Sequence, residues 1–157
     1  MRTTLFLVVL LFLASCGDPP NRLYGSMSQV YPLDFNTTRA TLVGDQVSIE
    51  YLRMSGQTTL GVTAKVTVSI GDIQPVVGTD IDMTQLLVSG LPRGTVQRVE
   101  SDGTTDFALQ VGAIHFNQEP VAAAEITGWF HTTVTADSAE STSRTLNGNF
   151  QTKVEAL

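Results

Sequence analysis

The sequence lacks the features that define several large classes of protein. With one cysteine in 157 residues, it cannot build an intramolecular disulfide framework. Basic residues are scarce: 9 Lys and Arg oppose 15 Asp and Glu, and a net charge of −6 argues against a nucleic-acid binder that neutralises phosphates. No apolar run approaches the roughly 20 residues that a membrane-spanning helix needs, which excludes a polytopic membrane protein. The 42% of apolar residues is enough for one domain around one core.

The most specific local signal lies at the N-terminus. Arg2 precedes an unbroken apolar run over residues 5–14, and Gly17-Asp18-Pro19-Pro20 ends that run. A short basic region followed by an apolar stretch of about ten residues is typical of a secretory signal peptide. The end of the run, Leu13-Ala14-Ser15-Cys16, resembles the lipobox of bacterial lipoproteins, in which small residues precede a cysteine.

This resemblance implies cleavage between Ser15 and Cys16 and the attachment of lipid chains, such as palmitate, to Cys16. The expected organisation is a cleaved signal peptide over 1–15, a lipidated cysteine with a short proline-stiffened tether over 16–22, and one β-domain over 23–157. The resemblance also implies a cell-envelope location, and Gly17 after the cysteine favours the outer membrane if the organism is Gram-negative. An ordinary signal peptide that is cut nearby is the alternative.

Alternation of apolar and polar residues predicts β-strands through the rest of the chain. Over 60–70 the even residues are apolar and the odd ones are polar or glycine, which is the period of a strand with one buried face. Val47, Ile49 and Tyr51 alternate in the same way, so the two segments predict an antiparallel hairpin. A switch from odd to even apolar positions at Gly112 predicts a β-bulge. About eight or nine such segments predict an all-β fold, an antiparallel β-sandwich or a partly open barrel.

A repeated pattern predicts that the chain ends in a β-hairpin. Residues 126–134 and 146–154 share the pattern (Ile or Leu)-x-Gly-x-Phe-x-Thr-x-Val. A turn around Glu140 then pairs Phe130 with Phe150, and a glycine makes room beside each ring. Two copies are too few for a repeat architecture, so the hairpin is the simpler interpretation.

Motifs that mark common enzymes are missing from the sequence. It contains no Gly-x-Ser-x-Gly, no His-Glu-x-x-His, no phosphate loop and no dinucleotide fingerprint. We therefore expect a non-enzymatic protein with no catalytic residue and no cofactor.

No metal site is expected either. His115 and His131 fall on outward strand positions and out of register with each other, without the spacing of zinc ligands. The Asp-rich segments 80–82 and 102–106 lack the dense ligand pattern of a calcium loop, and they predict turns instead.

One outward face carries a candidate ligand surface. Trp129 and His131 share this face, with Thr127 and Thr133 alongside. A tryptophan among hydroxyl groups resembles a sugar-stacking platform or an interface anchor. The alternative is a tryptophan that a loop or a second sheet covers.

Together these features predict an exported, lipid-anchored protein that acts as a non-enzymatic binding or structural module of the bacterial envelope. Its expected partners are the membrane, through lipid on Cys16, and an envelope protein or glycan. One alternative is a β-sandwich that binds carbohydrate or another small ligand on the Trp129 face. An envelope hydrolase that uses paired carboxylates is a third hypothesis.

The lipobox generates a direct prediction for Cys16→Ala. The variant should incorporate no radiolabelled palmitate in cells, because the acceptor thiol is gone, whereas Ser15→Ala, which keeps a small residue and the cysteine, should still be labelled. Lipid chains contribute about 0.8 kcal/mol per buried methylene to membrane binding. Equal labelling of Cys16→Ala and the unchanged protein would contradict the lipoprotein interpretation.

Overall fold

The computed structural model describes residues 20–135 and 142–156, and these form a β-stranded domain with one short 3-10 helix. The elements, in chain order, are β1 (Arg22–Tyr24), the 3-10 helix η1 (Ser26–Gln29), β2 (Thr37–Val43), β3 (Gln46–Ser55), β4 (Thr58–Ser69), β5 (Asp80–Asp82), β6 (Gly94–Glu100), β7 (Gly103–Phe116), β8 (Glu125–Thr135) and β9 (Ser143–Ala156). The prediction of an all-β fold with eight or nine strands and a C-terminal hairpin is confirmed.

The N-terminal predictions fall outside this region. Ser15 and Cys16, the expected cleavage and lipid-attachment residues, lie outside the described residues, as does the 136–141 connection between β8 and β9. The first strand begins at Arg22, at the end of the expected tether. Across 20–135 and 142–156, no helix is both long enough and apolar enough to cross a membrane.

Seven strands close into a barrel in the order β2-β3-β4-β6-β7-β8-β9. Closure comes from a short parallel pairing of β2 with β9, from Ala40 opposite Val154 to Leu42 opposite Ala156. The other neighbouring strands are antiparallel. β1 and β5 add to this barrel by pairing with β9 and β7, respectively. Each of the seven strands therefore has a paired neighbour on both sides, with β2 and β9 paired over three residues.

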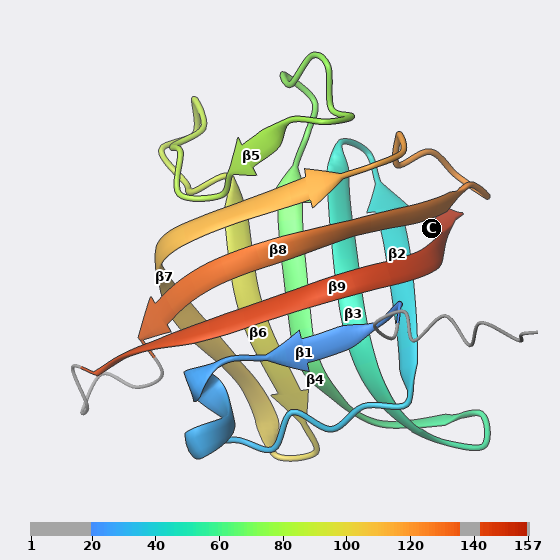
Figure 1. The fold of residues 1–157 in the computed structure, drawn as a ribbon, viewed down its shortest axis with the longest axis vertical. Helices are drawn as coiled ribbons and strands as arrows, with labels where there is room; N and C mark the ends of the chain where they lie inside the picture. Colours follow the sequence, from blue (N-terminus) through green and yellow to red (C-terminus); the bar gives the residue numbers. More distant parts are fainter. Residues whose placement is uncertain (1–19, 136–141, 157) are drawn as a thin grey trace, which may run out of the picture.

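The barrel is flattened into two layers whose strands cross steeply (Figure 1). Sheet A contains β1, β9, β8, β7 and β5, and sheet B contains β2, β3, β4 and β6 with one end each of β7 and β9. β7 pairs with β6 through Phe107 and with β8 from Ala108 onward, so this strand turns a corner between the layers. Its bulge lies between Leu109 and Val111, about two residues before the predicted position at Gly112.

The core fills the space between the layers with inward-facing side chains of both sheets. Tyr51 of β3 makes an edge contact with Phe130 of β8, with 6.0 Å between ring centroids, and it also packs edge-on against Phe35 at 4.9 Å. Met27 of η1 is buried against the same cluster. In Figure 1 the segment from η1 to β2 runs along the lower end of the barrel. This segment therefore closes that end with apolar side chains.

The register of the C-terminal hairpin differs by two residues from the predicted one. Phe130 lies opposite Gly148, and Phe150 lies opposite Gly128, whereas the sequence pattern suggested that the two rings face each other. A Cβ built on Gly148 would lie 2.5 Å from Phe130, and one on Gly128 would lie 2.5 Å from Phe150. Each ring thus occupies the space that the missing side chain of the opposite glycine leaves. Two rings placed directly opposite would compete for the same volume.

This packing predicts the effect of Gly148→Ala. The added methyl group would lie 2.5 Å from the Phe130 ring and forces that ring to move, and overpacking of this kind costs about 1–3 kcal/mol of the free energy of unfolding. Urea denaturation measures the loss. Thr133→Ala, on the outer side of the neighbouring strand β8, serves as the control and should change stability by about 0.5 kcal/mol or less. Equal losses in the two variants would contradict the packing of rings over glycines.

Candidate functional site

The predicted ligand residues lie in two cross-strand rows on the outer face of sheet A. The first row contains Asp80, His115, Trp129, Asn149 and Arg22, and the second contains Asp82, Ala113, His131, Asn147 and Tyr24. These ten residues define the Trp129 face. Neighbouring strands lie about 4.8 Å apart, so each row of five strands spans about 19 Å.

Strand alternation fixes the outward direction of these side chains. Ile81, Ile114 and Phe130, their neighbours along the chain, are buried in the core. Trp129 is half-buried and His131 is exposed. The signal that identifies these two residues in the sequence is therefore the same alternation that builds the core.

Two imidazole rings flank the indole of Trp129. The ring of His115 lies nearly parallel to it, with 5.2 Å between centroids and 8° between planes. The ring of His131 lies 4.7 Å away and is tilted by 46°. His115 pairs directly with Trp129 in the sheet, so the two histidines do not face each other but both contact the indole. The tryptophan side chain is held in position from two sides.

The two aspartates of the face are engaged at the β5 edge. The Oδ1 atom of Asp80 lies 2.7 Å from Nδ1 of His115. Asp82 Oδ1 accepts hydrogen bonds from the Thr84 hydroxyl at 2.6 Å and the Thr84 backbone N–H at 2.8 Å. These two bonds from Thr84 hold the pKa of Asp82 below its usual range. At the opposite edge, the guanidinium of Arg22 lies 5.1 Å from the ring centroid of Tyr24. The face therefore runs from an acidic edge to a basic one.

The centre of the face is fixed to the core through β9. Asn147 Oδ1 accepts a hydrogen bond of 3.2 Å from the Thr132 backbone N–H, which leaves the Asn147 amide nitrogen to donate elsewhere. The hydroxyl of Tyr51, reaching across from sheet B, donates to the main-chain carbonyl of Asn149 at 2.7 Å. Burial raises the pKa of Tyr51, so this hydroxyl stays protonated and keeps donating. Sheet B thereby supports the backbone beneath the Trp129 face.

Sequence reasoning identified only part of the face. Asn147 and Asn149 belong to β9, and Arg22 and Tyr24 belong to β1, far away in the sequence. The register of the C-terminal hairpin decides which residues of β9 stand beside Trp129, and that register was predicted incorrectly. No local sequence pattern predicts the pairing of β1 with β9.

The outer face of sheet B carries a second surface, which the sequence did not indicate as a site. It is a hollow of about 440 Å³ lined by Arg39, Thr41, Val43, Gln46, Ser48, Glu50, Lys65, Thr67, Thr95 and Gln97. We call it the sheet B hollow. The alternation of the predicted hairpin already placed Ser48 and Glu50 on the same side as Lys65 and Thr67, but nothing in it revealed a concave surface.

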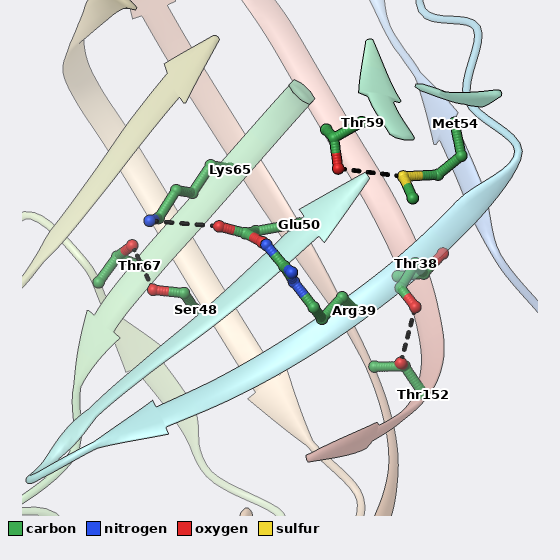
Figure 2. Close-up of polar contacts among 9 residues, drawn as sticks. All are labelled: Thr38, Arg39, Ser48, Glu50, Met54, Thr59, Lys65, Thr67 and Thr152. Atoms are coloured by element: carbon green, nitrogen blue, oxygen red, sulfur yellow. Dashed lines mark hydrogen bonds and ion pairs between the residues drawn. The ribbon is translucent and has the colours of Figure 1, made fainter. Parts of the chain in front are cut away.

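Polar groups in the sheet B hollow bind one another (Figure 2). Glu50 is only 6% exposed and lies between two cations: its Oε2 is 2.5 Å from Arg39 Nη2, and its Oε1 is 3.3 Å from Lys65 Nζ. The hydroxyls of Ser48 and Thr67 are 2.8 Å apart. A carboxylate this deeply buried is stable only when its charge is compensated. The ion network at the centre of the hollow is therefore needed to stabilise the buried Glu50 carboxylate in the folded protein.

The described residues offer no ready metal centre. Among residues 20–135 and 142–156, no group of three or more His, Cys, Asp and Glu side chains is arranged to hold a metal ion. The Asp80–His115 pair lies beside the indole of Trp129 instead of beside a third ligand.

The ion network of the hollow predicts the effect of Glu50→Gln. Removing the buried negative charge leaves Arg39 and Lys65 facing a neutral amide, so the free energy of unfolding should fall by about 1–3 kcal/mol. The control is Lys65→Gln, which removes the more distant of the two cations and should cost about 1 kcal/mol or less. Chemical denaturation of both variants measures the difference. A Glu50→Gln protein as stable as the unchanged one would show that the network contributes nothing.

Comparison with known protein families, with curated proteins and with solved structures finds no match to this chain. Any function of the two outer surfaces therefore has to be argued from the side chains that form them. In the centre of the sheet B hollow, the charge of Glu50 is neutralised by Arg39 and Lys65. The Trp129 face instead presents aromatic rings, amide groups and charges side by side on one outer surface.

Proposed function

We propose that this protein is a lipid-anchored, non-enzymatic binding module of the bacterial cell envelope, and that it binds a saccharide on the Trp129 face. One observation carries the proposal. Two aligned rows of aromatic, amide, carboxylate and guanidinium side chains cross five strands on the outer face of sheet A.

The chemistry of these rows matches that of a saccharide. Sugar rings present C–H groups that pack against aromatic side chains, and the exposed ring of His131 beside the half-buried indole of Trp129 supplies an aromatic surface of this kind. Sugar hydroxyls both donate and accept hydrogen bonds, and Asn147 and Asn149 each carry an amide group that can do the same. An extended outer face suits a chain of several sugar units, whereas a small molecule usually binds in an enclosed pocket.

Rigidity also supports a binding role. All ten residues of the Trp129 face stand on strands, and the Trp129 indole is held by two imidazoles. A surface that is already ordered loses less conformational entropy when a ligand binds. No catalytic step is proposed for this face.

The proposed lipid on Cys16 would hold the binding face at a membrane surface. Two or three acyl chains hold a protein on a membrane, and the short tether keeps the domain near that surface. Tethering raises the effective concentration of the face toward glycans carried by the same envelope. The ligand is then an envelope glycan or a glycan-bearing envelope protein, in the outer membrane if the organism is Gram-negative.

A second candidate function is that of a scaffold for a protein partner. The connection between β5 and β6 exposes Leu86, Val88 and Leu91 at its tip. The tip is ordered by backbone hydrogen bonds of 2.8 Å, from Leu87 N to Leu91 O and from Gly90 N to Leu87 O. Exposed apolar groups on an ordered loop favour contact with another protein surface.

The test of the main proposal uses Trp129, the single tryptophan of the chain. The mature protein in detergent is screened on a glycan array, and bound glycans are titrated by calorimetry. Trp129→Ala should weaken binding about tenfold, the equivalent of about 1.4 kcal/mol, because the aromatic cluster at the centre of the face loses the ring that His115 and His131 pack against. Thr67→Ala, in the sheet B hollow, is the control and should bind like the unchanged protein.

Two outcomes would overturn the saccharide proposal. One is the absence of any glycan response, and the other is unchanged affinity in Trp129→Ala. If no glycan binds but one envelope protein is crosslinked in cells and is lost in Leu86→Asp, the scaffold function is favoured.

A further inference from the structure

We infer that the sheet B hollow, together with a smaller hollow beside it, binds an extended segment of a partner protein that carries a carboxylate side chain and, about two to four residues further along, an aliphatic one. This inference goes beyond saccharide binding and is independent of it, because the Trp129 face belongs to the opposite layer of the barrel. It is carried by two rows of side chains that cross sheet B and by the connection between β5 and β6.

Two rows of outward side chains cross β2, β3, β4 and β6 side by side. The charged row consists of Arg39, Glu50, Lys65 and Gln97. The hydroxyl row, two residues away on each strand and thus at a distance of about 7 Å, consists of Thr41, Ser48, Thr67 and Thr95. Figure 2 shows the β3 and β4 members of both rows together. Hydroxyl groups both donate and accept hydrogen bonds, so this row can bind the N–H and C=O groups of an extended main chain.

The charged row keeps an excess of positive charge after Glu50 is compensated. Among the described residues that line the sheet B hollow, Arg39 and Lys65 are cations and Glu50 is the one anion, which gives a formal charge of +1 in a chain of net charge −6. Glu50 is buried, whereas the side chains of Arg39 and Lys65 are 40% and 32% exposed and carry more N–H donors than one carboxylate can accept. Asp106 of β7 stands two strands beyond Lys65 and accepts a hydrogen bond of 2.6 Å from Gln97. A carboxylate of a partner is therefore attracted to the Arg39 and Lys65 end of the hollow.

The connection between β5 and β6 forms an aliphatic wall beside the hydroxyl row. Leu87, Leu91 and Pro92 of this connection line a hollow of about 250 Å³ that shares Thr67 and Thr95 with the sheet B hollow, so the two hollows form one groove. The Leu91 side chain is 65% exposed, and backbone hydrogen bonds order the connection around it. The wall therefore offers accessible apolar surface in a fixed position.

The charge in the smaller hollow is already neutralised. Arg93, the charged member of the described residues that line it, is buried and donates hydrogen bonds to both carboxylate oxygens of Asp72. Arg93 also donates to the main-chain carbonyl of Ser69 at 3.0 Å. The smaller hollow thus favours an apolar side chain, whereas the sheet B hollow favours a carboxylate.

The chemistry of the groove fits a peptide better than a sugar or a small molecule. None of the described residues that line the two hollows is aromatic, so a sugar ring finds no stacking surface there. The groove lies along the outer face of sheet B, whereas a small molecule usually binds in an enclosed pocket. The aliphatic wall lies one or two rows beyond the cations, a distance of about 7–14 Å, which an extended chain covers in about two to four residues.

The test uses synthetic nine-residue peptides that carry one Glu and one Leu, two, three or four residues apart, among Gly and Ser. Matched peptides replace the Glu by Gln or the Leu by Ser, and every peptide carries the same neutral fluorophore. Fluorescence anisotropy measures binding to the mature protein in detergent, with detergent alone as the blank. At one or more spacings the Glu–Leu peptide should bind about fivefold more tightly than either matched peptide, because it gains an exposed ion pair and an apolar contact.

Variants of the protein locate the bound peptide. Lys65→Gln should weaken the Glu–Leu peptide about fivefold and leave the Gln–Leu peptide unchanged, because one ion pair is lost. Lys153→Gln, which removes the other lysine of the chain, on β9, is the matched control and should change neither. Leu91→Ala should also weaken the Glu–Leu peptide, whereas Val111→Ala on β7, which removes an equally exposed apolar side chain, should not.

The outcomes separate this inference from the proposed function. No binding of the Glu–Leu peptide at any spacing, or equal binding of all matched peptides, would overturn the peptide groove. Equal weakening of the Glu–Leu and Gln–Leu peptides in Lys65→Gln would overturn the pairing of the carboxylate with Lys65. Each of these results leaves saccharide binding on the Trp129 face standing, and a silent glycan array leaves the peptide groove standing.

Discussion

Two phenylalanine rings, each packed over a glycine of the neighbouring strand, set the register of β8 against β9. Phe130 lies over Gly148 and Phe150 over Gly128, with a built Cβ approaching each ring to 2.5 Å. Because side chains alternate along a strand, this inner register also fixes the outer one. It is the reason that Trp129 stands beside Asn149. A shift of two residues would place Gln151 there instead and would change the chemistry of the outer face.

The second constraint is the connection between the two layers. Parallel pairing of β2 with β9 closes the barrel, and the Tyr51 hydroxyl donates to the carbonyl of Asn149 from the opposite sheet. β7 and β9 belong to both layers, so sheet A cannot move as a separate unit. The outer face of sheet A, the proposed ligand surface, is therefore supported by the whole barrel, which would suit binding without rearrangement.

Sequence patterns predicted the strands well and their arrangement only in part. Alternation around Val47 to Tyr51 and over 60–70 reflects one buried face, and both segments are strands of one hairpin. The alternation of 60–70 fails at its start, where the register shifts near Thr63 and Leu60 is exposed, because a bulge moves side chains to the other face. Pattern alone also could not tell a ring that faces a ring from a ring that covers a glycine.

The candidate site was predictable to the extent that it is local. Trp129 and His131 lie on one strand, and their outward direction follows from alternation. Arg22 and Asn149 reach the same row only through the pairing of β1 with β9, which joins segments more than a hundred residues apart. The sheet B hollow depends likewise on four strands that come together only in the folded barrel. Contacts between distant segments carry most of the site, and one sequence holds little information about them.

The central claim is that the outer surface of sheet A is the ligand surface. The most direct measurement is a two-dimensional NMR titration of the isotopically labelled protein with an oligosaccharide that binds on the glycan array, with backbone amide shifts followed residue by residue. If the ligand binds there, the shifts should cluster on β1, β8 and β9, around Trp129, Asn147 and Asn149, and should leave the sheet B hollow unchanged. Shifts centred on β2, β3 and β4, or no shifts at all, would contradict it.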